Sequence, residues 1–335
     1  MADLARLRGR SFLVLGRAGM DLYADPPGTR IETAGRFVAH LGGSSANIAV
    51  ALVRQGCKAA LVTRVSDDAV GRFCLAQLDA CGVDRAHVRA AGGEARNSLA
   101  VVETRAEDCQ SVIYRNGAAD FSMGMADVEA LDYARHSALI TTGTVLAAEP
   151  SRSACFRAFD LARKAGLPLI FDVDYRPYSW PSAAMASAVY SRAGALCDVI
   201  VGNDVEFGFM AGDQAQGLDK ARSLIGAGAQ IVVYKKGEKG AITITPDGEF
   251  ATGIYPTRAL KPTGAGDSFL GAFAAALAEG RALRDAVLRG SAAAAMVVAR
   301  VGCAPAMPTG AELDAFLAEH PGPKPEGTDD AHSAA

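Results

Sequence analysis

The sequence predicts an α/β protein with a mostly parallel, doubly wound sheet, and three observations predict it. Short apolar runs alternate with longer segments of helical composition along most of the chain. The runs are apolar at nearly every position, which is typical of strands buried on both faces. The helical segments at 44–56 and 67–82 each end at a glycine, and the first begins at a serine, the usual signals of helix ends. Such alternation predicts a parallel sheet covered by helices.

The expected elements follow in chain order. We expect strands at 11–16, 59–65, 138–143, 167–174, 198–203 and 230–236. We expect helices at 44–56, 67–82, 150–166, 183–194, 203–211, 266–279 and 282–300. No internal repeat divides the chain, so residues 1–320 are expected to form one domain.

Two intervals break this alternation. Residues 17–42 contain Pro-Pro-Gly and little helical periodicity, and residues 97–116 resemble two strands joined by a polar turn. We expect both to form a small separate sheet, which would be either an edge hairpin or a lid that carries binding groups. The tail at 321–335 is rich in Pro, Gly, Ala and acidic residues, a composition that predicts disorder.

Composition excludes several classes of function. The 335 residues carry a formal net charge of −3 and no basic block, so nucleic acid is not an expected partner. No apolar stretch approaches the roughly 20 residues that span a bilayer, so a membrane is not expected either. Seven cysteines without a CxxC pair indicate reduced thiols and a cytoplasmic protein.

The segment KPTGAGDSF, at 261–269, contains the strongest candidate site. The backbone amides of Gly264, Ala265 and Gly266 lie at the expected start of a helix, where they lack partners and favour an anion. The acid that follows, Asp267, can accept a proton from an attacking hydroxyl beside a transferring phosphoryl group. An isolated glycine-rich turn is about as often an ordinary loop. The segment does not form a Walker A loop, and GRAGMD after the first strand does not complete G-x-G-x-x-G.

Three motifs in order, LGGSSANIA, VGNDVEF and PTGAGDSF, resemble those of the ribokinase-like (PfkB) sugar kinases, and the resemblance extends from about residue 11 to about 310. It implies a ribokinase-like three-layer α/β/α fold with a small β-sheet lid, and an ATP-dependent kinase that uses Mg²⁺. It also implies that Asp267 is the catalytic base and that Gly264, Ala265 and Gly266 form the anion hole.

The resemblance assigns further residues to the sugar and to the nucleotide. Sugar-binding residues would be Asp21, Gly42, Gly43 and Asn47. Nucleotide-binding residues would be Asn203, Lys236, Gly237 and Gly240, with Asn203 and Glu206 holding Mg²⁺ through water. A sparse set of ligands suits Mg²⁺, which keeps several waters. An Asn-x-x-Glu motif alone also marks an ordinary helix start.

One departure from the family pattern concerns a monovalent cation. Relatives often have an aspartate six residues before the base, where it helps to bind the cation, whereas this chain has Lys261. We expect the ammonium group to replace bound K⁺. The alternative is a solvated lysine at a strand end.

Two arginines indicate the kind of substrate. Arg115 follows the expected lid hairpin, and Arg176 follows a parallel strand at the edge where open sheets bind ligands. Because the guanidinium fork suits a carboxylate, the pair favours a sugar acid. Salt bridges to Asp172, Asp174 or Asp120 would explain them equally well.

The expected function is therefore ATP-dependent phosphorylation of a small-molecule sugar or sugar acid. A 2-keto-3-deoxygluconate kinase, a fructokinase and a ribokinase remain alternatives within the family. A non-catalytic nucleotide- or sugar-sensing protein on the same fold is the alternative of another class. Family lids often pair between subunits, so the resemblance also makes a homodimer through the lid an expectation.

Overall fold

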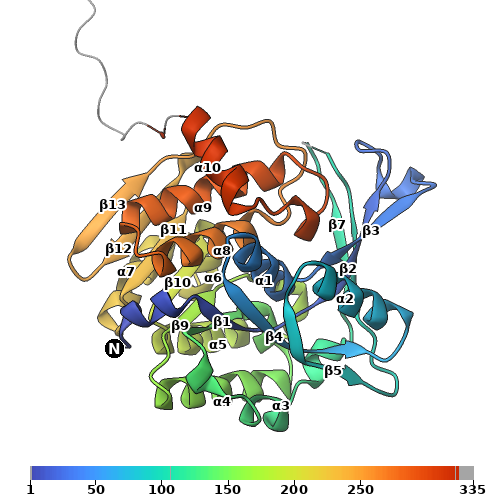
Figure 1. Ribbon diagram of the computed structural model, residues 1–335, viewed down its shortest axis with the longest axis horizontal. Coiled ribbons are helices and arrows are strands. Elements are labelled where there is room, and N and C mark those ends of the chain that lie inside the picture. Colours follow the sequence, from blue (N-terminus) through green and yellow to red (C-terminus); the bar gives the residue numbers. More distant parts are fainter. Residues whose placement is uncertain (1, 106, 321, 324–335) are drawn as a thin grey trace, which may run out of the picture.

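A nine-stranded sheet forms the centre of the molecule, in the order β13-β12-β11-β10-β9-β8-β1-β4-β5 (Figure 1). The structure is a computed structural model that describes residues 2–105, 107–320 and 322–323. The strands are β1 (Ser11–Leu15), β4 (Lys58–Ser66), β5 (Asp84–Ala91), β8 (Ala138–Thr142), β9 (Leu169–Asp172), β10 (Val199–Asn203), β11 (Ile231–Lys235), β12 (Ala241–Thr245) and β13 (Gly248–Thr252). Every neighbouring pair among β11, β10, β9, β8, β1, β4 and β5 is parallel, and β12 and β13 add an antiparallel edge hairpin. The mostly parallel sheet and its six predicted strands are confirmed.

Strand β1 illustrates why apolar runs form this sheet. Phe12 and Val14 belong to one hydrophobic core, whereas Leu13 and Leu15 belong to another on the opposite face. All four side chains are fully buried. Successive residues of a strand point to opposite faces, so a strand covered on both sides must be apolar at every position.

Helices cover both faces of the sheet. They are α1 (Ser44–Arg54), α2 (Ala69–Ala80), α3 (Met125–Glu129), α4 (Ser151–Lys164), α5 (Ala183–Leu196), α6 (Asp204–Ala211), α7 (Gly217–Gly226), α8 (Ala265–Ala278), α9 (Leu283–Val298) and α10 (Gly310–Glu319). Buried residues of α1, α8 and α9 pack in one core, and those of α4, α5 and α7 pack in the other. The seven predicted helices are confirmed, while α3, α7 and α10 were not predicted.

The two intervals that break the alternation form one small separate sheet, which we call the lid. Its strands lie in the order β3-β2-β6-β7, and it projects from one side of the molecule (Figure 1). They are β2 (Gly19–Ala24), β3 (Phe37–Gly42), β6 (Ser98–Val102) and β7 (Ser111–Tyr114). Strand β2 pairs in parallel with β6, which joins the two intervals. The small separate sheet is thus confirmed.

Among the helices of the described residues, none combines the length and the apolar character needed to cross a bilayer. The tail expected to be disordered lies outside the described residues, apart from residues 322–323.

Candidate active site

The candidate site lies beyond the carboxyl ends of the parallel strands. From β1 the chain proceeds to β4 and β5 on one side, and later from β8 to β9, β10 and β11 on the other. The chain therefore changes direction between β1 and β8, the kind of position where open α/β sheets bind ligands.

Helix α8 begins at the predicted glycine-rich turn. Gly264 has φ +84°, and a Cβ there would lie 2.9 Å from the Sγ atom of Cys303, so glycine is required. Among the described residues, no acceptor is recorded for the amides of Ala265, Gly266 and Asp267. The positive end of a fourteen-residue helix therefore presents free donors to an anion.

Asp267 lies in the first turn of α8. Burial is the main cause that raises its pKa to about 7, and the charge of Asp174 adds to the effect. A hydrogen bond that Asn47 Nδ2 donates to Asp267 Oδ2, 2.8 Å long, opposes it, as does the positive charge of Arg176. A carboxylate with a pKa near neutrality is well matched to accepting a proton at neutral pH.

Close packing of α1 on α8 brings Asn47 to Asp267. A Cβ at Gly271 would lie only 2.3 Å from the Cβ of Ala51, so the two helices approach as closely as glycine permits. Asn47 precedes Ala51 by four residues and Asp267 precedes Gly271 by four, so each pair occupies one face of its helix. Asn47 Oδ1 is also buried, and no described residue donates to it.

Gly42 makes room for Asp21, which lies on β2, and the adjacent Gly43 makes room for the backbone that precedes this strand. A Cβ at Gly42 would lie 2.0 Å from Asp21 Oδ1, and one at Gly43, where φ is +95°, would lie 2.6 Å from the carbonyl oxygen of Arg17. Burial raises the pKa of Asp21 to about 6, although the charges of Arg17 and Lys261 lower it. The Gly-Gly motif therefore packs a buried carboxylate against bare backbone.

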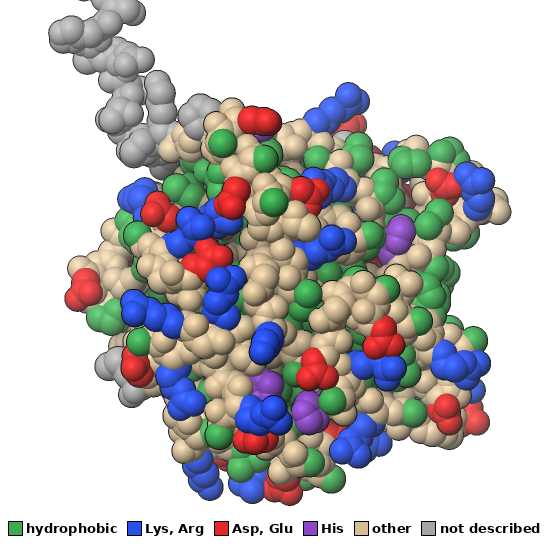
Figure 2. All heavy atoms as spheres, in the orientation of Figure 1, with side chains coloured by type: hydrophobic (Ala, Val, Ile, Leu, Met, Phe, Trp, Pro, Cys, Tyr) green, Lys and Arg blue, Asp and Glu red, His purple; other side chains and the backbone are tan. Residues whose placement is uncertain are grey.

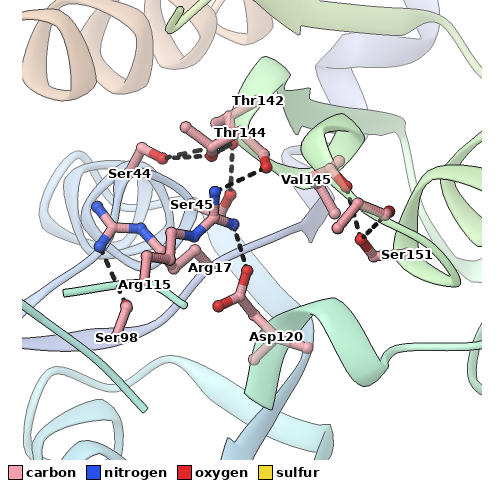
Figure 3. Close-up of polar contacts among 12 residues, drawn as sticks. Arg17, Ser44, Ser45, Ser98, Arg115, Asp120, Thr142, Thr144, Val145 and Ser151 are labelled. Carbon is pink, nitrogen blue, oxygen red and sulfur yellow. Dashed lines mark hydrogen bonds and ion pairs between the residues drawn. The ribbon is translucent and has the colours of Figure 1, made fainter. Parts of the chain in front are cut away.

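Both arginines predicted to bind a carboxylate already contact one. Arg115 forms a buried ion pair with Asp120, and its Nη1 donates to the carbonyl of Thr144 over 2.9 Å (Figure 3). Arg176 Nη2 lies 2.7 Å from Asp174 Oδ1, and 41% of the Arg176 side chain is exposed. The salt bridges weighed as alternatives are present, and the lid brings Arg115 from β7 into the site.

Lys261 is fully buried, which excludes the solvated lysine at a strand end. Its Nζ donates to the carbonyl of Thr263 over 2.6 Å and to that of Val297 over 3.4 Å. Burial lowers the pKa of Lys261, whereas Cys303, Asp267 and Asp21 raise it. The ammonium group thus contacts two backbone carbonyl oxygens, one of them from Thr263 in the glycine-rich turn.

Asn203 and Glu206 form a reciprocal cap at the start of α6. Asn203 Oδ1 accepts from the Glu206 amide over 2.9 Å, and Glu206 Oε2 accepts from the Asn203 amide over 2.7 Å. Burial raises the pKa of Glu206, while the nearby Lys235 lowers it. The motif therefore has the helix-start role that it has elsewhere, and the buried carboxylate lies at the edge of the site.

Lys235, the residue before the predicted nucleotide-binding Lys236, approaches the glycine-rich turn. Its Nζ would lie 3.5 Å from a Cβ at Gly266 and lies 5.5 Å from the centre of the Phe269 ring. Lys236 lies in the following loop, where its amide donates to the carbonyl of Gly240. In that loop Gly237 has φ +59° and Gly240 has φ +78°. Strand alternation could have distinguished the two lysines, because adjacent residues point to opposite faces.

Sequence reasoning also missed Arg17, and it considered Asp174 only as a possible salt-bridge partner of the arginines. Arg17 follows the last residue of β1 by two positions, as Asp174 follows the last residue of β9. Asp174 has φ +37° and holds Arg176. Their position past the ends of central strands is the signal that could have found them.

Comparisons with known proteins agree with this geometry. The family model "pfkB family carbohydrate kinase" matches residues 10–310. A 5-dehydro-2-deoxygluconokinase of Geobacillus kaustophilus is 37% identical, covering 92% of this chain and 94% of its own, and one of Photobacterium profundum is 38% identical, covering 91% and 94%. A solved fructokinase double mutant of Vibrio cholerae, with fructose, ADP and potassium ion bound, is 26% identical with a TM-score of 0.79, covering 92% and 98%. The chain belongs to the pfkB family of carbohydrate kinases.

Proposed function

We propose that this kinase transfers the terminal phosphoryl group of ATP to the C6 hydroxyl of 5-dehydro-2-deoxy-D-gluconate, a reaction of myo-inositol catabolism. The names of relatives that match nearly the whole chain support this substrate. The observation that carries the chemistry is the buried Asp267, placed directly beside unpaired amides at the start of α8. A base and an anion-binding turn are the two parts that phosphoryl transfer to an alcohol needs.

Asp267 accepts the proton of the attacking hydroxyl in the proposed mechanism. The backbone of Gly264, Ala265 and Gly266 binds the migrating phosphoryl group, whose negative charge spreads over its oxygens. Lys235 Nζ, close to Gly266, adds a positive charge at the same place. Burial of the base excludes water, which limits wasteful hydrolysis of ATP.

The sugar acid binds between the lid and the central sheet. Asp21 and Asn47 orient its hydroxyl groups, and Gly42 and Gly43 let it approach the backbone. Arg115 and Arg176 provide positive charge for its carboxylate end, each retaining its own acidic partner. The second carboxylate oxygen of Asp120 supports this arrangement. This atom, Oδ1, is buried and accepts no hydrogen bond from a described residue.

The nucleotide phosphates extend from the turn towards β11. Lys236, Gly237 and Gly240 would contact them, and Asn203 and Glu206 would hold Mg²⁺ through water. The buried Glu206 carboxylate fits this role, because its described partners are the backbone amides of Asn203 and Tyr175. The bound ion would neutralise charge on the phosphates.

Lys261 takes the place of a monovalent cation in this proposal. Its ammonium group already contacts two backbone carbonyls next to the glycine-rich turn. A fixed positive charge there supports the turn and the anion that the turn binds.

The lid is proposed to pair two copies of the chain. It exposes apolar side chains on its outer strands β3 and β7, with exposed fractions of 37% for Phe37, 40% for Val38, 43% for Val112 and 61% for Tyr114. Hydrophobic side chains also gather on the lid side of the face seen in Figure 2. The seven free cysteines favour a cytoplasmic location for the enzyme.

A panel of candidate acceptors tests the proposed substrate. Steady-state ADP production with ATP and Mg²⁺ is measured for 5-dehydro-2-deoxygluconate, 2-keto-3-deoxygluconate, fructose and ribose. We expect the highest kcat/KM for 5-dehydro-2-deoxygluconate and the lowest values for the two neutral sugars. A neutral sugar as the best substrate would contradict the proposal.

A further inference from the structure

Arg17 stands out because it is a buried cation without an acidic partner. It follows β1 at the point where the chain leaves the central sheet for the lid, and it is only 8% exposed. Its Nη1 donates to Ser98 Oγ over 3.1 Å (Figure 3). Its Nε is buried without a partner, and no described carboxylate oxygen lies within 4.0 Å of its nitrogens.

Such an arrangement is costly in the free protein. A guanidinium group has five N–H donors, and a buried charge is normally paired with an opposite charge. The neutral hydroxyl of Ser98 accepts from one of these donors and supplies no opposite charge. Arg115 and Arg176 differ, since each already contacts the carboxylate of an aspartate. Of these three arginines, Arg17 therefore has the most to gain from a negatively charged ligand.

The guanidinium also lies among the groups that define the site. It is the largest of the charges that lower the pKa of Asp21, which burial raises, and it also lowers the pKa of the buried Asp267. Its like charge lowers the pKa of Arg115, which burial lowers most. In Figure 3, the side chains of Arg17 and Arg115 lie next to each other. Arg17 is thus inside the site at its lid end.

We propose that Arg17 is the specificity-determining residue of this kinase, because its guanidinium group binds the carboxylate of the sugar acid directly. Arg115 and Arg176, held by Asp120 and Asp174, flank that contact and add positive potential. This inference rests on the proposed sugar-acid kinase function and names the side chain that selects the acid. The substrate would supply the counter-charge that the folded chain lacks.

The test compares 5-dehydro-2-deoxygluconate with its neutral C1 carboxamide in the wild-type enzyme and in Arg17→Gln and Arg17→Lys. For Arg17→Gln, kcat/KM for the acid should fall on the order of 100-fold, mainly through KM. The value for the carboxamide should change less than about threefold, and the KM for ATP should stay unchanged. Arg17→Lys keeps the charge but not the fork, so its preference for the acid should be intermediate.

Ser98→Ala is the matched control, because it removes the recorded partner of Arg17 and keeps the charge. Its preference for the acid should persist. Thermal unfolding and ATP binding are measured for every variant to check that it folds. If Arg17→Gln does not fold, the comparison of acid and carboxamide is made with Arg17→Lys instead.

Three outcomes separate the possibilities. Equal losses on acid and carboxamide would overturn the inference, because Arg17 would then act on folding or on the phosphoryl group. Unchanged kinetics in Arg17→Gln would overturn it as well. A wild-type enzyme that prefers the carboxamide or a neutral sugar would instead overturn the sugar-acid function on which the inference rests.

Discussion

At the scale of single residues, the site depends on charges held away from water. Asp21 and Asp267 are both buried acids with raised pKa values, of about 6 and about 7. Burial disfavours their charged forms, and the surrounding cations Arg17, Arg176 and Lys261 partly restore them. Burial therefore explains why both carboxylates have pKa values close to neutrality, and the nearby arginines and Lys261 limit how far these pKa values rise.

Asp267 should control the dependence of the rate on pH. Because only its ionised form can accept a proton, kcat/KM should fall as the pH drops through about 7. Asp267→Asn should lower kcat by roughly 10²–10⁴-fold and abolish this acid limb. Rates measured from pH 5 to 9 check both points. Arg176→Gln removes a charge that lowers this pKa, so it should move the acid limb of the profile to higher pH; an unmoved limb would assign the limb to another group.

Lys261 should make the enzyme indifferent to monovalent cations. Initial rates in potassium, sodium and tetramethylammonium chloride of equal ionic strength should agree within about twofold, since the ammonium is part of the chain. Lys261→Ala should lose activity and recover part of it with added K⁺ or NH₄⁺. A wild-type enzyme that needs K⁺ would refute the proposed replacement.

Sequence reasoning at this scale reached the residues that belong to contiguous motifs. It identified the glycine-rich turn and singled out Lys261, because both belong to one contiguous sequence motif at 261–269. It named Asp120 among three aspartates that could pair with the arginines, but it did not determine which of them holds Arg115. It named Lys236 as a nucleotide-binding residue, which stays a prediction, and did not consider Lys235, because a motif fixes a position along the chain but not the direction of a side chain.

At the scale of elements, the crossing of α1 and α8 sets the geometry of the base. Gly271 and Ala51 allow the helices to touch, and the same faces carry Asp267 and Asn47. The cap of α6 places Glu206 in a comparable way, because the side chains of Asn203 and Glu206 each accept a hydrogen bond from the backbone amide of the other residue. Each element thus places a functional group by means of an ordinary packing or capping contact.

Gly271→Leu should separate α1 from α8 and break the contact between Asn47 and Asp267. We expect both a loss of stability of about 1–3 kcal/mol and a fall in kcat. Chemical denaturation and steady-state kinetics measure the two effects. Gly226→Leu is the matched control, because a Cβ there meets no atom within 4 Å; equal effects in the two variants would argue against the crossing.

The cap of α6 can be separated from its proposed Mg²⁺ role. Asn203→Ala should reduce the free energy of unfolding by about 1 kcal/mol, whereas Asn203→Asp should keep the cap. Glu206→Gln should raise the Mg²⁺ concentration needed for half-maximal rate, about tenfold if Glu206 orients metal-bound water. Denaturation curves and Mg²⁺ titrations of the rate give these values. An unchanged Mg²⁺ requirement would leave Glu206 with the cap alone.

The two edge strands of the central sheet that sequence reasoning missed, β5 and β13, share a physical cause. The predicted strands are buried on both faces, so every position is apolar. By contrast, β5 has the sequence DRAHVRAA and exposes most of its residues, and β13 has GEFAT at the sheet edge. Edge strands need few apolar residues, so their composition resembles that of loops. Pairing with a neighbouring strand creates them, and a local pattern does not reveal it.

At the scale of the whole molecule, two sheets meet around the candidate site. The central sheet supplies the ends of its parallel strands, and the lid supplies Asp21 and Arg115. The edge-hairpin alternative for 97–116 is set aside, because β6 and β7 extend a sheet that starts at β2. The outer strands of this sheet expose the large apolar side chains of Phe37, Val38, Val112 and Tyr114.

The lid surface should hold two chains together. Tyr114→Lys combined with Val112→Lys should convert a dimer into a monomer, because two charges would be buried at the contact. Light scattering after size-exclusion chromatography measures the mass. Met125→Lys, on an exposed apolar residue outside the lid, is the control. A wild-type protein that is monomeric at micromolar concentration would refute lid pairing.

The contact between Asn47 and Asp267 joins residues 220 positions apart in the chain. A ribosome therefore produces most of the polypeptide, including every strand of both sheets, before the decisive helix α8 emerges. Nascent or truncated fragments that end before this helix contain neither the proposed base nor the proposed phosphate-binding turn. If these roles hold, incomplete copies cannot consume the cell's ATP by this route.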